Sequence, residues 1–388
     1  MSNGSCIVGI PKEVKTREGR VGMTPSGVQR IVGRGARVFV ERGAGLLSKF
    51  SDSDYESAGA LLVDGPKQIW SESNLVVKVK EPVPSEYPHL AELRGRGLFT
   101  YLHLAGVDKG LTLDLLSHRI AAIAYETVSE TVGGKTVFPL LVPMSHIAGI
   151  QSARGALLRH PKENYAMLNA VVIGGGNVGE AALQHFLANG IGPISVFESH
   201  GPRIHELCDK YANDKGVITF PLSALDGSLG REILRTADIV ICGPMSPGGK
   251  EAPIVLTARK HFRYMKRGAY IADVSIDQGG STEWTRGHPT KPGETFTRGS
   301  RGLVFSSVAN IPGSTVPDEA TLALTDVTLP YIELIVHRFM FGGSMYGVLN
   351  GFPALLSGLQ TFNGYLTNEH VALKHGLEER YRSVHELL

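Results

Sequence analysis

Several polar residues of this chain stand directly after apolar runs, which is where side chains of an α/β protein usually meet a ligand. Lys80 ends the run that begins at Leu75, and a cation there could hold a carboxylate. The alternation of side chains along a strand would put Lys80 on the same face as Lys78. A solvated lysine at a sheet edge is the alternative interpretation, and this residue taken alone favours it.

His103, Asp277 and Arg20 are the other candidates for chemistry. His103 closes the apolar run that begins at Leu98, and imidazoles ordinarily titrate close to neutral pH, although a histidine between leucines is more often a core residue. Asp277 precedes Gln-Gly-Gly and is equally well a turn former or an active-site carboxylate. Arg20 could bind a carboxylate through two parallel hydrogen bonds, but a surface arginine is the default.

These residue types suit hydride transfer between a nicotinamide and an amino or keto acid. Such a site needs cations for the substrate carboxylate and a proton donor–acceptor for its amine or carbonyl. The cofactor itself carries the hydride, so the protein has to orient the two partners.

The segment from Val171 to Gly179 has the glycine spacing of a dinucleotide-binding turn between a strand and a helix. Gly174 would permit the tight turn, Gly176 would let the main chain approach a pyrophosphate, and Gly179 would let the helix pack on the strand. The helix N-terminus would offer N–H groups to the phosphates, and we count Asn177 and Val178 among the cofactor-binding residues. A turn of this kind that binds nothing is the alternative.

An acid, Glu198, closes the next expected strand, about 20 residues beyond the glycines, as in dinucleotide-binding units. Its carboxylate would accept hydrogen bonds from the ribose hydroxyls and repel a 2′-phosphate, so NAD is favoured over NADP. His200 and Arg203 follow closely and are the feature that could admit NADP.

Length and composition agree with an enzyme of two domains. The chain has 388 residues and a net charge of +2, without a basic run, which argues against a nucleic-acid binder. Cys6, Cys208 and Cys242 are too far apart for a disulfide framework or a metal site, and they fit a reducing cytoplasm. We expect no signal peptide at the N-terminus. The uncharged stretch Phe339–Asn368 is broken by glycines and a proline, so buried turns and short helices are expected there rather than a membrane span.

Short apolar runs alternate with helical patterns, which predicts βαβ units and mainly parallel sheets. Thr24 and Pro25 should cap and begin a helix, a long helix should run from about Ser145 to Arg159, and a capped helix should begin near Pro317. The region from Trp284 to Gly302 is expected to be an irregular loop. The expected strands are Cys6–Ile10, Ala36–Val40, Leu75–Val79, Leu98–His103, Ala121–Tyr125, Ala170–Ile173, Ile194–Phe197, Val217–Phe220, Asp238–Cys242 and Gly268–Val274.

Taken together, these residues resemble the alanine dehydrogenase family, within the wider group that includes the nucleotide-binding subunit of proton-translocating transhydrogenase. The matching segments run in family order over nearly the whole chain. They are Gly9–Glu13, Arg20–Pro25, Lys78–Pro82, Leu102–Ala105, Tyr125–Thr127, Pro143–Ser145, the turn at Gly174, Ile276–Gly280 and Val308–Pro312.

The resemblance implies an α/β protein of two Rossmann-like, doubly wound domains. A discontinuous substrate domain would comprise residues 1–140 and 318–388, an NAD-binding domain would comprise residues 141–317, and the site would lie in the cleft between them. The resemblance also implies a homohexamer. It implies reversible oxidative deamination, in which L-alanine loses its α-hydride to NAD and water then converts the imine to pyruvate and ammonia.

The resemblance also assigns roles to single residues. Arg20 and Lys80 would bind the substrate carboxylate, His103 would be the acid–base group, and Asp277 would lie beside substrate and nicotinamide. The cofactor side would include Ser145 near the phosphates, Asn310 near the nicotinamide and substrate, and Met245 in the segment Cys242–Pro247 that matches the adenine-side wall.

Some segments depart from the family pattern. The glycine-rich flap before the cofactor-binding strand is replaced by His160–Leu168, His146 stands where an acid is expected, and Pro312–Asp318 carries an extra residue. These changes motivate one alternative, a related dehydrogenase for another amino acid or for an opine-type or saccharopine-type secondary amine. A dinucleotide-binding module without catalysis is a further alternative, and the presence of both His103 and Asp277 argues against it.

Overall fold

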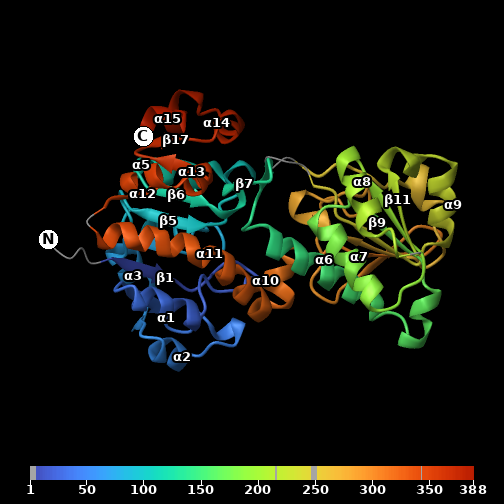
Figure 1. The fold of residues 1–388 in the computed structure, drawn as a ribbon, viewed down its shortest axis with the longest axis horizontal. Helices are drawn as coiled ribbons and strands as arrows, with labels where there is room; N and C mark the ends of the chain where they lie inside the picture. Colours follow the sequence, from blue (N-terminus) through green and yellow to red (C-terminus); the bar gives the residue numbers. More distant parts are fainter. Residues whose placement is uncertain (1–5, 215, 246–250, 342) are drawn as a thin grey trace. The chain divides into compact units, whose positions relative to one another are not determined.

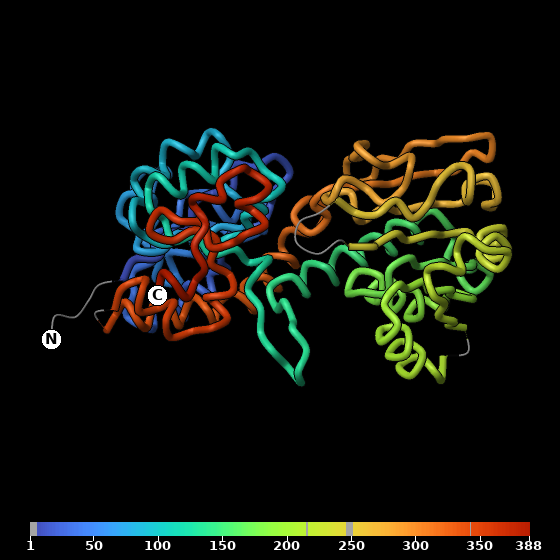
Figure 2. Tube along the Cα trace, turned by 90° about the horizontal axis from the view of Figure 1, so that it is seen from above, coloured from blue at the N-terminus to red at the C-terminus, as the bar shows by residue number. Residues whose placement is uncertain are grey.

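The computed structural model describes residues 6–214, 216–245, 251–341 and 343–388. The chain divides into two compact units, Met1–Met144 with Val316–Leu388, and Ser145–Thr315. The first unit is therefore discontinuous in sequence, and Figure 2 shows its red C-terminal segments beside blue and teal N-terminal ones. We describe each unit by itself.

The first unit contains a sheet of eight strands in the order β17-β16-β6-β5-β4-β1-β2-β3. The six strands from β6 to β3 are parallel and reproduce a doubly wound order, because the chain moves outward in one direction to β3 and then returns beside β1 with β4. The strands are β1 Ile7–Ile10, β2 Arg37–Glu41, β3 Leu61–Val63, β4 Leu75–Val77, β5 Gly97–Thr100, β6 Ala121–Ala124, β16 Leu359–Phe362 and β17 Tyr365–Leu366.

Helices cover this sheet (Figure 1), and one of them shows how local sequence fixes its start. Thr24 accepts a hydrogen bond from Gly27 N–H and Pro25 occupies the first turn of α1, as expected. The helices and helical turns are α1 Pro25–Gly33, η1 Leu46–Ser48, α2 Asp52–Ser57, α3 Pro66–Glu72, α4 Tyr87–Leu90, η2 Leu104–Gly106, α5 Lys109–Ser117, η3 Tyr125–Thr127, α11 Pro317–Met340, α12 Met345–Gly351, α13 Pro353–Gly358, α14 Glu369–His375, η9 Glu378–Arg380 and α15 Val384–Leu387.

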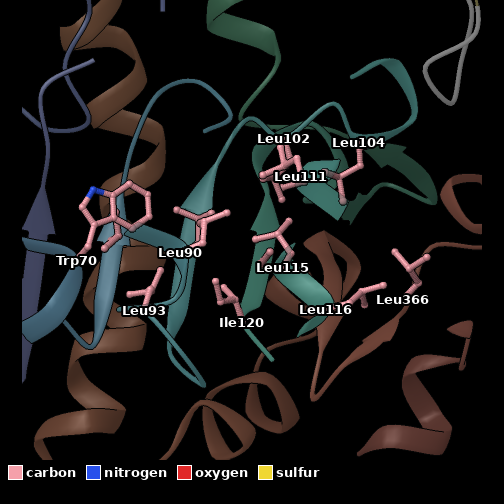
Figure 3. Close-up of a cluster of buried hydrophobic side chains, with 14 of the residues drawn as sticks. Trp70, Leu90, Leu93, Leu102, Leu104, Leu111, Leu115, Leu116, Ile120 and Leu366 are labelled. Atoms are coloured by element: carbon pink, nitrogen blue, oxygen red, sulfur yellow. The ribbon is translucent and has the colours of Figure 1, made fainter. Parts of the chain in front are cut away.

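A leucine-rich core fills the space between this sheet and its helices (Figure 3). Leu111, Leu115 and Leu116 of α5 pack with Leu98 of β5 and with Leu366 near the C-terminus. Each fully buried leucine contributes about 1.5–3 kcal/mol relative to exposure. The C-terminal segment is thereby joined to the N-terminal strands, which explains why segments so distant in sequence form one unit.

The second unit contains a sheet of seven strands in the order β11-β10-β9-β12-β13-β15-β14, parallel except for β14. Its strands are β9 Ala170–Ile173, β10 Ile194–Glu198, β11 Val217–Pro221, β12 Ile239–Cys242, β13 Tyr270–Asp273, β14 Phe296–Arg298 and β15 Leu303–Ser306. Its helices are α6 Val142–Leu157, η4 Lys162–Met167, α7 Asn177–Ala188, α8 Gly201–Lys210, η5 Leu222–Asp226, α9 Ser228–Thr236, η7 Ala258–Phe262, η8 Val274–Gln278 and α10 Ile311–Thr315.

Both faces of this second sheet are covered, as is usual for parallel sheets. Along β9, Ala170 and Val172 belong to one apolar cluster, and Val171 and Ile173 belong to the cluster on the opposite face. The period-two alternation of a strand therefore divides one continuous apolar run between two cores. This explains why the strand reads as an unbroken apolar segment in the sequence.

Several expectations need correction. Residues 284–302 are not wholly irregular, because β14 pairs antiparallel with β15. The stretch Phe339–Asn368 does contain short helices, but it also contributes the antiparallel pair β16 and β17. Helix α11 begins at Pro317 without a side-chain cap, since its N-cap position is Val316. The segment His160–Leu168, which replaces the glycine-rich flap of the family pattern, contains the helical turn η4.

A hairpin of β7 Glu130–Val132 and β8 Lys135–Val137 completes the secondary structure of the first unit, and Tyr331 of α11 contacts it by donating a hydrogen bond to Glu130. Across the part of the chain that the structure describes, none of the helices has the length and apolar character needed to cross a membrane.

Candidate active site

Parallel strands bring their carboxyl ends to one edge of a sheet, and in the first unit the candidate residues follow these ends. β1 and β4 are neighbours at the point where the strand order reverses, and β5 and β6 follow on. Arg20 lies in the loop after β1, Lys80 follows β4, and His103 follows β5. The fold therefore gathers Arg20, Lys80 and His103 at one edge although they are far apart in sequence.

Arg20 is a buried residue and not the surface arginine that was the default expectation. It is 3% exposed, and its guanidinium donates to Glu18 from Nε to Oε1 at 2.7 Å and from Nη2 to Oε2 at 2.6 Å. Nη1 lies 3.1 Å from Sδ of Met144. Burial opposes charge on Glu18, but Arg20 overrides it and lowers the pKa of Glu18 to about 2. The two-bond grip expected for a substrate carboxylate is therefore already used by Glu18, and it fixes the direction of the guanidinium.

The segment that carries Arg20 is fastened to α11. Val21 N–H donates to Thr321 Oγ1 at 3.2 Å, and Thr24 N–H donates to Thr325 Oγ1 at 3.1 Å. Ser48 Oγ donates to the carbonyl oxygen of Gly19 at 2.8 Å. Neutral hydroxyl groups make these hydrogen bonds with the main chain on both sides of Arg20. The loop is therefore held in place without a further charge that would compete for the guanidinium.

Lys80 lies beyond the end of β4, so the expected strand to Val79 is too long and the strand alternation does not relate Lys80 to Lys78. Lys78 is fully buried and bridges two carboxylates, with Nζ 2.8 Å from Glu86 and 3.3 Å from Glu13. These two acids raise the pKa of Lys78 against the effect of burial. Lys80 is half-buried, with Nζ 6.0 Å from the centre of the Tyr101 ring. The two lysines therefore differ in role. Lys78 holds two buried carboxylates together, whereas Lys80 lies at the carboxyl edge of the sheet.

His103 is exposed and not a satisfied core histidine. Its side chain is 43% accessible, its ring stacks on Tyr101 with centroids 5.7 Å apart, and its main chain is left-handed with φ +46°. The strand β5 ends at Thr100, so the expected strand to His103 was too long. The Tyr101 hydroxyl donates to Leu140 O at 2.6 Å, which holds the ring beneath His103. Burial raises the pKa of Tyr101, so this phenol stays neutral at working pH.

In the second unit the order reverses between β9 and β12, and the glycine turn follows β9. Gly174 has φ +91°, and a Cβ on Gly179 would lie 1.9 Å from the carbonyl oxygen of Gly174. Both positions therefore require glycine, one for conformation and one for close approach. A Cβ on Gly176 would meet nothing within 4 Å, so the space before the N-terminus of α7 is open. Helix α7 begins at Asn177, with Val178 in its first turn.

Glu198 is the last residue of β10, and its carboxylate is buried against main-chain donors. It accepts hydrogen bonds from N–H of Gly175 at 2.6 Å, Ser199 at 2.7 Å and His200 at 2.8 Å. Arg203 is engaged elsewhere, because Nε donates to Gly175 O at 2.8 Å and Nη1 lies 2.7 Å from Glu206. Its Nη2 also pairs with Glu180.

A cavity of about 500 Å³ opens after the carboxyl ends of β10 and β11, where Ser199 and Pro221 line it together with residues of the segment 253–261. Ser199 and Ser223 give it hydroxyls, Leu222 and Ile254 give it apolar walls, and His261 lines it with its ring buried. Met245, expected in the adenine-side wall, is exposed and does not line this cavity. Ser246 and Pro247 of the same expected wall lie outside the described residues.

Asp277 and Asn310 follow β13 and β15 and lie together. The Asn310 N–H donates to both carboxylate oxygens of Asp277, at 3.0 and 3.2 Å, and Asn310 has a left-handed φ of +53°. Asp277 is exposed, whereas Asp273, four residues earlier, is buried and accepts hydrogen bonds from Ser281 and Ser275. Ser145 is half-buried in the first turns of α6, which packs so closely on α7 that a Cβ on Gly149 would lie 2.1 Å from Val178 O.

Known proteins match this chain over nearly all of its length. The description "Alanine dehydrogenase/PNT, N-terminal domain" fits residues 9–148, and "Alanine dehydrogenase/PNT, C-terminal domain" fits residues 163–369. Alanine dehydrogenase of Bacillus subtilis (strain 168) is 40% identical over 386 residues, covering 96% of this chain and 95% of that protein. The chain belongs to the alanine dehydrogenase/PNT family.

Further members of the alanine dehydrogenase/PNT family agree in sequence and in fold. Alanine dehydrogenase of Staphylococcus epidermidis (strain ATCC 12228) is 38% identical, covering 98% of this chain and 99% of that protein. The solved structure of an L-alanine dehydrogenase superposes with a TM-score of 0.81 at 32% identity, over 95% of this chain and 99% of that one. A transhydrogenase from Sinorhizobium meliloti shares the fold, with a TM-score of 0.73 at 19% identity, over 93% of this chain and 99% of that one. The expectation of two doubly wound α/β domains is thereby confirmed.

Sequence reasoning missed three residues at the sheet edge of this family member. Glu18 stands two residues before Arg20, which is a usable signal for an ion pair. Glu126 appeared only within a matching segment, and its contact with His103 depends on the register of β5 and β6. Tyr101 stands two residues before His103, and the expected strand Leu98–His103 would already have put the two side chains on one face.

Proposed function

We propose that this protein is an NAD-dependent L-alanine dehydrogenase, which converts L-alanine reversibly to pyruvate and ammonia. The observation that carries the proposal is the presence of Arg20, Lys80 and His103 at one sheet edge of the first unit. This set answers the chemical need for cations at a carboxylate and a proton donor–acceptor at the neighbouring carbon. The names of the relatives, alanine dehydrogenase in each of the curated proteins reported above, support the same substrate.

In this proposal Arg20 and Lys80 bind the substrate carboxylate. Glu18 holds Nε and Nη2 of Arg20, which fixes the orientation of the guanidinium. The ammonium group of Lys80 stands beside the Tyr101 ring, on which His103 also stacks. A carboxylate between the two cations would leave the α-carbon of the substrate close to the imidazole.

His103 is the proposed acid–base residue. In deamination it accepts a proton from the water that attacks the imine carbon and returns one to the departing nitrogen. In the reverse direction it protonates the carbinolamine oxygen as water leaves. An imidazole suits both directions because its ordinary pKa lies near neutral pH.

The residues of the second unit fit NAD. The open space at Gly176 and the N-terminus of α7 suit a pyrophosphate, and the carboxylate of Glu198 suits ribose hydroxyls. The bound cofactor supplies the hydride acceptor for oxidation and the hydride donor for reductive amination. We propose that Ser145 contacts the phosphates, that Asp277 and Asn310 border the nicotinamide and substrate, and that the cavity at Ser223 takes the adenosine end. We also propose that Met245 contacts the adenosine end of the cofactor from outside this cavity.

The proposed assembly is a homohexamer in the cytoplasm. The three cysteines Cys6, Cys208 and Cys242 are unpaired thiols, which fits a reducing compartment. Light scattering coupled to size-exclusion chromatography measures the assembly, and a mass of six chains is expected. A mass of one chain at working concentration would contradict it.

The activity is tested by following NADH absorbance with ammonium and a panel of 2-oxo acids headed by pyruvate. Rapid oxidation that requires both ammonium and pyruvate is expected. A strong preference for a bulkier 2-oxo acid, or for an amino acid in place of ammonium, would refute alanine and move the function to a related amino-acid or secondary-amine dehydrogenase. NADH binding without turnover of any partner would refute catalysis altogether.

A further inference from the structure

The carboxylate of Glu126 lies beneath the turn that carries His103. Glu126 belongs to the helical turn η3 that follows β6, and the pairing of Thr100 with Ala124 sets the ends of β5 and β6 side by side. Oε1 of Glu126 accepts a hydrogen bond from His103 N–H at 2.6 Å, and both carboxylate oxygens lie within 3.3 Å of Leu102 N. One carboxylate therefore collects two successive main-chain N–H groups.

These bonds explain an unusual main-chain conformation. His103 has φ +46° and ψ +35°, which costs a residue other than glycine about 1–2 kcal/mol. Left-handed residues turn consecutive N–H groups toward one point, and such a concavity binds anions. The partly buried carboxylate of Glu126 fills that concavity and stabilises the conformation. The turn continues with Gly106 N–H donating to His103 O at 2.7 Å.

The same carboxylate faces the imidazole ring. Nδ1 of His103 lies 3.7 Å from Oε1 of Glu126, which is longer than a hydrogen bond but close enough for an ion pair with a protonated ring. The opposite constraint comes from Tyr101, whose ring lies parallel to the imidazole within 5°. The ring is thus bounded by a carboxylate at Nδ1 and by an aromatic face.

We propose that Glu126 is a positioning residue for His103, which fixes its main chain, selects Nε2 as the nitrogen that exchanges protons with the substrate, and stabilises the imidazolium formed when it accepts one. This inference rests on the proposed function for its kinetic consequences, but the coupling between the two side chains does not. When His103 is protonated, the contact at Nδ1 becomes an ion pair. When it is neutral, the main-chain bonds still hold the residue in place.

Other charged and titratable groups surround the contact between Glu126 and His103. Burial raises the pKa of Glu126, and its bonds to the N–H groups of His103 and Leu102, together with Lys80, act in the opposite direction. Tyr101 stays neutral, while Arg20 and Glu18 act on that phenol and compensate each other as a pair. Because the Glu126 carboxylate lies 3.7 Å from Nδ1 and favours a protonated ring, removing its charge should lower the pH at which His103 protonates.

The test compares Glu126→Gln with the wild-type full-length protein. Glutamine keeps an oxygen that can accept from His103 N–H but removes the charge. The first readout is the pH dependence of acylation of His103 by diethyl pyrocarbonate, which reacts with neutral imidazole. The tryptic peptide 97–109 has His103 as its sole histidine, so mass spectrometry of this peptide isolates the signal. The midpoint should move to lower pH by about 0.5–1 unit.

The second readout is the pH profile of reductive amination. In Glu126→Gln we expect kcat to fall by about 10-fold to 100-fold, the KM for the 2-oxo acid to change little, and the acid limb of the profile to move with the acylation midpoint. Glu126→Asp, which keeps the charge, should retain the wild-type acylation midpoint. The matched control is Glu92→Gln, a change of the same type at an exposed position, which should alter neither readout.

An unchanged acylation midpoint in Glu126→Gln overturns the inference, even if activity falls, because a merely structural role would lower activity without moving the titration. If Glu126→Gln fails to fold, Glu126→Asp takes its place as the test. An acylation midpoint in Glu126→Asp that moves as far as the shift expected for Glu126→Gln would overturn the inference. If the wild-type protein turns over no amino or keto acid while the midpoint still shifts, the coupling stands and the proposed function fails.

Discussion

Glu18 and Arg20 form a buried ion pair whose contribution to stability follows from one pKa. The side chain of Glu18 is fully buried, and Arg20 lowers its pKa from 4.5 to about 2 in spite of burial. A shift of about 2.5 units corresponds to about 3 kcal/mol, at 1.36 kcal/mol per unit. We therefore expect Glu18→Gln to lower the free energy of unfolding of the first unit by about 3 kcal/mol at pH 7.

The pH dependence has a definite sign. The pKa of Glu18 is lower in the folded than in the unfolded protein, so the stabilisation is complete above the unfolded value and is lost as the pH falls through the folded value. The difference between wild type and Glu18→Gln should shrink to about 2 kcal/mol at pH 3.5. A difference that stays constant or grows on acidification would contradict the assignment of the shift to this pair.

Urea unfolding followed by tryptophan fluorescence measures this difference. The chain has two tryptophans, and Trp70 lies in the core of the first unit, so a Trp284→Phe background reports on that unit alone. The matched control is Asp64→Asn, which breaks the exposed ion pair between Arg42 and Asp64 and should leave stability unchanged within error. An unfolding free energy of Glu18→Gln equal to that of the control would refute the reasoning.

Four further substitutions have defined outcomes. Gly176→Ala should weaken NADH binding by at least about tenfold without loss of stability, whereas Gly179→Ala should also unfold the turn, because its Cβ would overlap the carbonyl oxygen of Gly174. Fluorescence titration with NADH and thermal melting distinguish the two variants. Equal effects of the two substitutions on binding and on stability would contradict the assigned roles. Glu198→Ser should raise NADPH affinity relative to NADH, measured by the same titration, and an unchanged ratio would remove Glu198 as the basis of NAD preference. Lys78→Met should destabilise the first unit by about 3–5 kcal/mol in urea, because it leaves two carboxylates buried without their cation; wild-type stability would refute this.

Most of the parallel strands were predictable, because a buried apolar run carries its own signal, but β3 and β15 were not among the expected strands. Ala170–Ile173 was predicted with its observed bounds, since it is apolar on both faces and is bounded by polar loops. The antiparallel strands β16 and β17 were not predicted, because they lie in a segment whose apolar residues fit short helices equally well. The strand conformation of β16 depends on pairing with β6, more than two hundred residues earlier in the chain, and β17 pairs in turn with β16, which local sequence cannot indicate.

The sequence indicated which residues belong to the candidate site, but not the burial and the hydrogen-bond partners of those residues. Lys80 and His103 follow strand ends as expected, yet both strands end earlier than the apolar runs, and the extra residues form the loops that carry the site. The burial of Arg20 depends on Glu18 and on contacts with α11, which belongs to the C-terminal part of the chain. The role of Glu126 follows from strand register, so it emerged only from the structure.

The central claim, an alanine dehydrogenase, is tested most directly by identifying the product. Wild-type protein is incubated with NADH, pyruvate and ¹⁵N-labelled ammonium, and the products are analysed by mass spectrometry and chiral chromatography. We predict one labelled L-alanine for each NADH oxidised, and a turnover reduced to background in His103→Gln, which keeps NADH binding. Oxidation of NADH without labelled alanine, or full turnover in His103→Gln, would contradict the account.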